Sequence, residues 1–189
     1  LLLVGCESQP TTQTPPKVDW TSVAVPDFSA DSAFGFIEEQ LAFGPRVPNT
    51  AEHAACAEWL QDKFRSYGLQ VKVQNGVVTA FDGTALNIYN IIAAYKPERA
   101  KRIMLSAHWD TRPFGDNDPD KTYHTQPIPG ANDGGSGVAV LLEIARLISQ
   151  DDSLDIGVDI FLWDAEDDGK PNVENSYCLG TQYWAKNRL

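Results

Sequence analysis

The chain has 189 residues, of which 42% are hydrophobic and 22% charged, so it can bury the core of a single globular domain. Its formal net charge of −11 argues against nucleic acid as a partner, because a phosphate backbone would be repelled. No cysteine lies in a recognisable nucleophile motif with a histidine, which argues against a cysteine protease.

The first six residues, Leu-Leu-Leu-Val-Gly-Cys, are typical of the tail of a secretory signal followed by a bacterial lipoprotein cleavage box. Cys6 would be the lipidated residue, and the apolar run is too short to span a bilayer. Residues 7–25 begin with a stretch rich in Ser, Gln, Thr and Pro, as flexible tethers are. We expect a protein of the bacterial cell envelope, lipid-anchored to a membrane and periplasmic or surface-exposed. An apolar start without a targeting role is the alternative.

Two amphipathic helices are expected where the globular part, residues 26–189, begins. The first has apolar residues at helical spacing from position 34 to 41 and stops at Gly44-Pro45. The second follows Asn49, which with Glu52 is similar to a capping box, and ends at Gly68. His53 lies off the inner stripe of this helix, so we expect it on the surface. The stripe itself comprises Ala57, Leu60, Phe64 and Tyr67.

Strands are expected next. Residues 69–73 alternate between polar and apolar, and the pattern continues over 77–81 after Asn75-Gly76, a dipeptide that favours a hairpin turn or a bulge. Residues 87–95 form a further strand. The loop 111–129 contains four prolines and no helix or strand pattern, and loops of this length often line binding sites.

Two short apolar runs, residues 102–107 and 158–163, are typical of buried parallel strands. Each run is followed at once by side chains that bind metals. These side chains are His108 and Asp110 after the first run, and Glu166 and Asp167 after the second.

A glycine-rich turn at 130–137 lies between the two runs and carries Asp133. It opens a helix that returns the chain for the second strand. A right-handed crossover would make the two strands parallel neighbours and gather the five side chains at their carboxyl ends, where α/β sheets bind ligands. The expected fold is therefore α/β, a mixed β-sheet with helices on both faces, antiparallel at one edge.

Carboxylate and imidazole ligands without thiolate suit zinc, or another divalent ion such as manganese. Crowded carboxylates repel one another unless a cation or a proton separates them, so the cluster itself argues for a metal. Neighbouring side chains at a strand end point apart, so Asp167 can face the metal while Glu166 faces the substrate as a base. Taken singly, Asp133 is explained as a helix cap and His108 as a sheet-edge histidine. Their joint placement favours the metal site.

These motifs, followed by Cys178-Leu-Gly-Thr-Gln-Tyr-Trp-Ala185, resemble the M28 metallopeptidase superfamily, and within it the bacterial glutaminyl-peptide cyclotransferases. The resemblance runs from about Phe34 to the last residue. It implies a zinc-exopeptidase-like α/β sandwich with one zinc ion held by Asp133 and Asp167, and Glu166 as the acid/base. His108 and Asp110 match a pair of residues that serves a second metal in the two-metal aminopeptidases of the superfamily. The single-zinc cyclotransferases usually retain the histidine, but it does not bind metal there.

Two departures from the family pattern matter. Two-metal aminopeptidases commonly carry a Glu-Glu pair where this chain has Glu166-Asp167, which favours the cyclotransferase branch. The remaining zinc ligand of the family is a histidine far downstream, and neither His53 nor His124 lies in a matching motif. Because the chain also ends within an apparent helix over 185–189, we expect it to be part of a longer protein.

The expected activity converts the N-terminal glutamine of a peptide or protein into pyroglutamate and releases ammonia. The first alternative is a zinc aminopeptidase, in which Glu166 activates water. The second is a non-catalytic, peptide-binding lipoprotein. Cys56 and Cys178 could form a disulfide or remain free thiols, and the sequence leaves both open.

Overall fold

The computed structural model of the chain describes residues 19 and 24–188. The strands are β1 (Gln70–Thr79), β2 (Ala85–Tyr95), β3 (Arg102–His108) and β4 (Gly157–Trp163). The helices are α1 (Ala30–Leu41), α2 (Ala51–Ser66), α3 (Gly135–Ile148) and α4 (Leu179–Lys186), with a short 3-10 helix, η2 (Lys121–Tyr123), in the long loop.

The four strands form one sheet in the order β1-β2-β4-β3. β2 is antiparallel to both of its neighbours, and β3 runs parallel to β4. α3 lies between the parallel strands in the chain, so β3, α3 and β4 form the expected crossover unit. His108 is the register partner of Trp163, so the two parallel strands end at the same level. The predicted mixed α/β sheet is confirmed.

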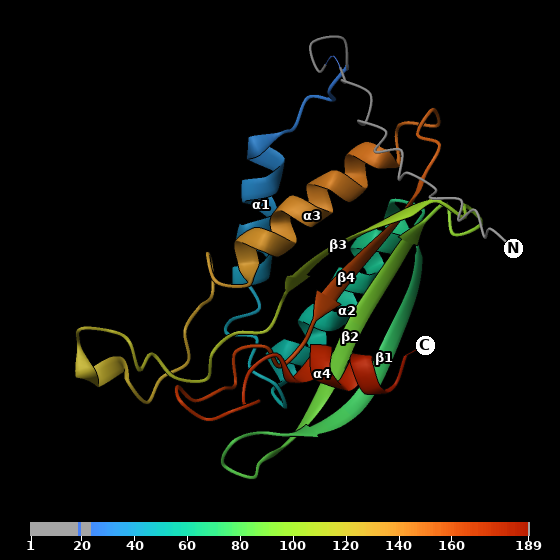
Figure 1. Cartoon of the computed structure of the whole chain (residues 1–189). Coiled ribbons are helices and arrows are strands. Elements are labelled where there is room, and N and C mark those ends of the chain that lie inside the picture. Colours follow the sequence, from blue (N-terminus) through green and yellow to red (C-terminus); the bar gives the residue numbers. More distant parts are fainter. Residues whose placement is uncertain (1–18, 20–23, 189) are drawn as a thin grey trace, which may run out of the picture.

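Helices cover both faces of the sheet (Figure 1). α2 and α3 pack on one face, with α1 against α3, and α4 crosses the other face over β1 and β2. The larger core lies under α2 and α3, and a smaller one lies under α4. Burying each leucine or isoleucine stabilises the fold by roughly 1.5–3 kcal/mol. Fully buried members of the larger core include Leu60, Phe64, Ile91, Leu142 and Ile160.

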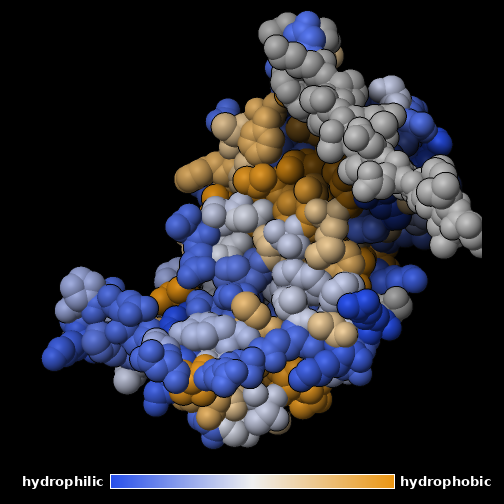
Figure 2. Space-filling view, in the orientation of Figure 1, coloured by the Kyte–Doolittle hydropathy of each residue, from blue (hydrophilic) through white to orange (hydrophobic). Residues whose placement is uncertain are grey.

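β3 is an edge strand, and part of its apolar surface is open to solvent. Ile103 and Met104 are 45% and 50% exposed, and Val140 of α3 is also exposed. Figure 2 shows hydrophobic surface in the upper half of the molecule, where β3 and α3 lie in Figure 1, above a mostly hydrophilic lower half.

Two local predictions are wrong. Asn75-Gly76 lies within β1, opposite Tyr89 and Ile88, because β2 continues to offer pairing partners across it. The chain turns later, where the carboxylate of Asp82 accepts the backbone N–H of Thr84. The N-cap of α2 is Thr50, not Asn49, and its hydroxyl oxygen accepts the backbone N–H of His53.

The last helix is shorter than expected, and the structure decides between the two states that the sequence left open for Cys56 and Cys178. α4 ends at Lys186 instead of continuing to the final residue. Cys56 is buried in the core and Cys178 is exposed at the start of α4, and both are free thiols.

The predictions for the N-terminus concern residues that lie mostly outside the described part of the chain, including lipidation at Cys6 and most of the tether at 7–25. Within residues 19 and 24–188, none of the helices has the length and the apolar character that crossing a bilayer requires.

Candidate active site

The structure brings the five predicted side chains together at the carboxyl ends of β3 and β4. His108 is the last residue of β3, and Asp110 lies two residues further along the chain. Asp133 belongs to the turn that leads into α3, and Glu166 and Asp167 follow β4. Contacts among these residues join the two strand ends into one site.

Asp110 connects the two strand ends. It is fully buried, and its carboxylate accepts the backbone N–H groups of Glu166 and Asp167, each at 3.1 Å. One carboxylate therefore fixes the backbone of both the predicted acid/base and a predicted zinc ligand. Asp110 holds the site in shape through these two bonds.

His108 lies between two carboxylates. Its Nε2 is 2.9 Å from Oδ1 of Asp133, and its Nδ1 is 3.5 Å from Oδ1 of Asp110. Burial opposes protonation of the ring, but the carboxylates of Asp110, Glu166 and Asp133 outweigh it and raise the pKa of His108 to about 9. Nε2 is thus hydrogen-bonded to Asp133, whereas Nδ1 faces Asp110 at ion-pair distance and has no hydrogen-bond partner among the described residues.

Asp167 is buried, and its Oδ2 has no hydrogen-bond partner in the described part of the chain. Burial, with repulsion from Asp133 and Asp110, raises the pKa of Asp167 to about 6. Arg112, whose Nη1 lies 3.5 Å from Oδ1 of Asp167, offsets part of this rise. A buried carboxylate oxygen without a partner is costly, and a cation would satisfy it.

Asp168 lies in an environment similar to that of Asp167. It is buried, its Oδ2 is likewise without a partner among the described residues, and its pKa rises to about 7 through burial and repulsion from Asp110 and Asp164. From the sequence, no role is predicted for Asp168, and the structure buries it beside the site.

The donor set fits part of a zinc site. Asp133 is exposed, and it lines an open hollow together with His108, Asn132 and Ser136. Among residues 19 and 24–188, no group of three or more His, Cys, Asp and Glu side chains is arranged to hold a metal ion by itself. Structural and catalytic zinc sites use three or four protein ligands. Asp133 and Asp167 thus fit as two of them, and their role stays a prediction.

Glu166 is half-buried, and its carboxylate accepts a hydrogen bond from the thiol of Cys178, with 3.1 Å between Sγ and Oε1. The backbone around Glu166 is held from α4. The N–H groups of Cys178, Leu179 and Gly180 donate to the carbonyls of residues 166, 165 and 164 in turn. The acid/base candidate is therefore on a fixed turn instead of a mobile loop.

Gly134 has to be glycine for the turn to approach β3. Its φ is +78°, and a side chain there would meet the carbonyl oxygen of Asp110 at 2.8 Å and the ring of His108 at 3.3 Å. This close approach brings Asp133 within reach of His108.

Arg46 is a structural residue of the site that the sequence interpretation missed. Arg46 lies between α1 and α2 in the sequence and is fully buried. Its guanidinium donates hydrogen bonds to the backbone carbonyls of Trp109, Pro129 and Gly130. It thereby joins the end of β3 to the glycine-rich turn. In the sequence, this role is indicated only by the position of Arg46 between two prolines, in Pro-Arg-Val-Pro.

His53 was predicted on the surface, and this is wrong. It is fully buried and contacts the carboxylate of Asp164. Spacings of four, seven and eleven residues separate it from Ala57, Leu60 and Phe64, so it belongs to the buried stripe of α2. This spacing is the sequence signal for its burial.

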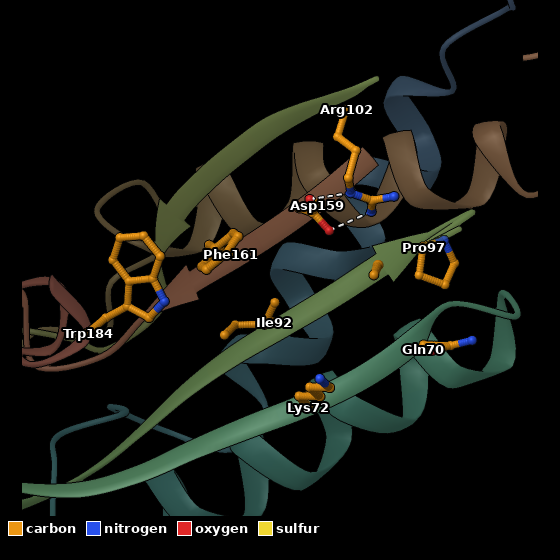
Figure 3. A pocket seen from close by; sticks show the side chains of 9 residues that line it. Gln70, Lys72, Ile92, Pro97, Arg102, Asp159, Phe161 and Trp184 are labelled. Carbon is orange, nitrogen blue, oxygen red and sulfur yellow. Dashed lines mark hydrogen bonds and ion pairs between the residues drawn. The ribbon is translucent and has the colours of Figure 1, made fainter. Parts of the chain in front are cut away.

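A hollow on the α4 face of the sheet is separate from this site (Figure 3). Ile92, Phe161 and Trp184 line it, and the guanidinium of Arg102 makes two hydrogen bonds, 2.7 and 2.6 Å long, to the carboxylate of Asp159. Asp159, which is neutralised by Arg102, lies near the start of β4. The predicted metal ligands lie beyond the opposite end of that strand, so this hollow is not part of the predicted metal site.

Residues 90–189 match the model of peptidase family M28. The chain belongs to peptidase family M28. This confirms the resemblance that the motifs indicated.

Solved M28-like structures share the fold at high identity. A Zn-dependent exopeptidase from Parabacteroides distasonis is 52% identical with a TM-score of 0.84, over 87% of this chain and 58% of that one. A leucine aminopeptidase precursor from Bacteroides thetaiotaomicron is 52% identical with a TM-score of 0.84, over 88% and 59%. Tannerella forsythia glutaminyl cyclase is 49% identical with a TM-score of 0.82, over 85% and 56%. The M28 chain therefore spans less than two thirds of each neighbour.

These neighbours are described as both peptidases and cyclases at nearly equal identity. They support an M28 enzyme and zinc as its metal. They do not choose between cyclisation and hydrolysis.

Proposed function

We propose that the full-length protein is a zinc-dependent glutaminyl-peptide cyclotransferase that acts on N-terminal glutamine of peptides or proteins. The observation that carries this choice is the position of His108. Its Nε2 lies 2.9 Å from the carboxylate of Asp133, so the ring nitrogen that faces the proposed zinc ligand has a hydrogen-bond partner within the protein. A single zinc ion is the arrangement that the resemblance associates with the cyclotransferases.

Asp133 and Asp167 would hold the zinc ion, and the unpartnered buried oxygen of Asp167 supports its role. Zinc, when bound, would polarise the side-chain amide carbonyl of the substrate glutamine as a Lewis acid. The α-amine of the same glutamine forms a bond to that carbonyl carbon, and the bond from this carbon to the amide nitrogen breaks.

Glu166 moves the proton. Its carboxylate accepts a proton from the attacking amine and returns it to the departing nitrogen, which leaves as ammonia. The turn that Asp110 and α4 hold would keep this carboxylate in place through both transfers. The acidic surroundings of Asp110, Asp133 and Asp167 would also attract the cationic N-terminus of a peptide.

Two measurements test the proposal. The zinc-loaded full-length protein should release ammonia, and no free amino acid, from a glutaminyl dipeptide, and should leave a leucyl dipeptide intact. Metal analysis should give one zinc ion per chain. Release of leucine together with two ions per chain would support the aminopeptidase alternative, which the exopeptidase neighbours favour.

We also propose that Cys6 carries a lipid anchor and that the enzyme works in the bacterial cell envelope, at the membrane surface. The support is the sequence Leu-Val-Gly-Cys at positions 3–6 and the polar stretch that follows it. A diacyl anchor would hold the protein stably, because two acyl chains exceed the marginal membrane binding of one.

A further inference from the structure

A buried histidine and aspartate that the proposed reaction does not use lie directly behind the active site. His53 of α2 and Asp164, the residue after β4, are both fully buried. Nε2 of His53 is 2.8 Å from Oδ1 and 3.0 Å from Oδ2 of the Asp164 carboxylate. The ring of Trp109 stacks on the imidazole, with 4.4 Å between centroids and 11° between planes. The imidazole is therefore fixed in orientation as well as in position.

The carboxylate of Asp164 has further partners on two other elements. It accepts the backbone N–H of Tyr89 in β2 at 2.6 Å and the backbone N–H of Ala165 at 2.8 Å. The backbone N–H of Asp164 in turn donates to the side chain of Asn90 at 3.1 Å. Asp164 thus joins α2, β2 and the beginning of the active-site turn.

The turn itself has an unusual backbone. Ala165 has a φ of 47°, in the left-handed region that residues with a side chain rarely adopt. Such a conformation persists only where its surroundings hold it. The bond from the N–H of Ala165 to Asp164 holds this residue directly, and Glu166 is the next residue along the chain.

His53 completes the set of donors on Asp164. Because a carboxylate only accepts hydrogen bonds, the contact assigns the ring proton to Nε2, and Nδ1 is buried without a hydrogen-bond partner in the described part of the chain. Without that donor, the Asp164 carboxylate would lose its hydrogen bond to His53 while it remains buried. A buried carboxylate with missing partners shifts or rotates to find others. Rotation would release the N–H of Ala165.

We propose that His53 is a positioning residue: through Asp164 it fixes the left-handed turn at Ala165 and thereby the place of the Glu166 carboxylate. The inference rests on the proposed function for its kinetic consequence. Its structural consequence, a turn held from α2, does not depend on which reaction the enzyme catalyses.

The test compares three variants of the zinc-loaded full-length protein with the wild type. His53→Leu removes the N–H donor and keeps an apolar group against Trp109, whereas His53→Gln keeps an N–H donor at similar reach. Leu60→Ala is the matched control, because Leu60 is a fully buried residue of the same helix and belongs to the core. Two experiments are carried out below the unfolding temperature of every variant. Steady-state kinetics gives kcat and KM, and amide hydrogen exchange is followed in residues 164–167.

We expect His53→Leu to lower kcat by up to about a hundredfold with little change in KM, since small misplacements of a catalytic group have effects of this size. Exchange in 164–167 should become faster. His53→Gln should restore most of both, and Leu60→Ala should lower the unfolding temperature without changing either. Unchanged exchange in His53→Leu, or equal losses in Leu60→Ala, would overturn the inference. If the wild type releases no ammonia, the proposed function fails, and the exchange comparison still decides the role of His53.

Discussion

The thiol of Cys178 donates a hydrogen bond to the carboxylate of Glu166, with 3.1 Å between Sγ and Oε1. Partial burial of the sulfur and the neighbouring carboxylate raise the pKa of Cys178 to about 11. The contact places a thiol, which can be modified chemically, against the predicted acid/base. Modification of Cys178 therefore tests the role of Glu166.

Alkylation of Cys178 by iodoacetamide should be slow and should inactivate the enzyme. At pH 8 a pKa of about 11 leaves about a hundredfold less thiolate than an ordinary cysteine has, and the thiolate is the reactive form. The added group would occupy the space beside Glu166. Mass spectrometry with activity measurements follows both effects. Glu166→Gln should speed the alkylation, and Cys178→Ser should resist inactivation. Alkylation at an ordinary rate would contradict the contact.

Glu166→Gln in the full-length protein should keep zinc and substrate binding but lose turnover. The amide has the shape of the carboxylate but cannot take up and return a proton, and such transfers contribute roughly a hundred- to ten-thousandfold to rate. The measurements are ammonia release under saturating substrate and zinc content by metal analysis. Turnover at the wild-type rate would remove Glu166 from the mechanism.

Asp133→Asn should lower zinc affinity sharply, because it keeps the size of the side chain and removes the charge that offsets the cation. Competition with a zinc chelator measures the affinity. Asp155→Asn is the matched control, since Asp155 is an 82% exposed residue whose ion pair with Arg99 lies outside the site. Equal zinc affinity in Asp133→Asn and the control would show that Asp133 is not a ligand.

Zinc should stabilise the protein more at pH 7.5 than at pH 5. Without metal, burial raises the pKa of Asp167 to about 6 and that of Asp168 to about 7, from ordinary values near 3.8. Between those values the folded state binds more protons than the unfolded state, so stability falls as pH rises from about 4 to about 7. The pKa of His108, raised to about 9, adds stability below its ordinary value of 6.5 that is lost as pH rises to about 9. Both contributions have the same sign.

Thermal unfolding with chelator and with zinc at the two pH values checks this expectation. Asp168→Asn should weaken the pH dependence of the metal-free protein while keeping the gain from zinc, because Asp168 is not a proposed ligand. A zinc-induced rise in melting temperature that is equal at both pH values would argue against the crowded carboxylates as its cause.

Cys6→Ala should release the full-length protein from membranes, because the cysteine is the proposed site of acylation. Fractionation followed by immunoblotting gives the distribution. Cys56→Ala serves as the control, since Cys56 is a buried thiol of α2. Retention of the Cys6 variant in the membrane fraction would contradict the anchor.

The sequence by itself determined where the chemistry lies. Two apolar runs that each end in acidic or imidazole side chains, with a glycine-rich turn and a helix between them, allow few arrangements once the crossover is right-handed. The structure therefore shows His108, Asp110, Asp133, Glu166 and Asp167 at the same end of β3 and β4, as the order of elements predicts. Asn75-Gly76 shows the limit of such local signals. The dipeptide favours a turn, yet pairing with β2 holds it within a strand.

Only the tertiary structure decided which groups hold the site in shape. His53 and Asp164 are 111 residues apart, and Arg46 lies 84 residues from Gly130, so no local pattern indicates either contact. The thiols of Cys56 and Cys178 stay free because Cys56 is buried in α2 on one face of the sheet, whereas Cys178 starts α4 on the opposite face. Hydrogen-bond partners of this kind are chosen by the packing of whole elements against one another, because a buried polar group binds whichever donor or acceptor the fold brings within reach.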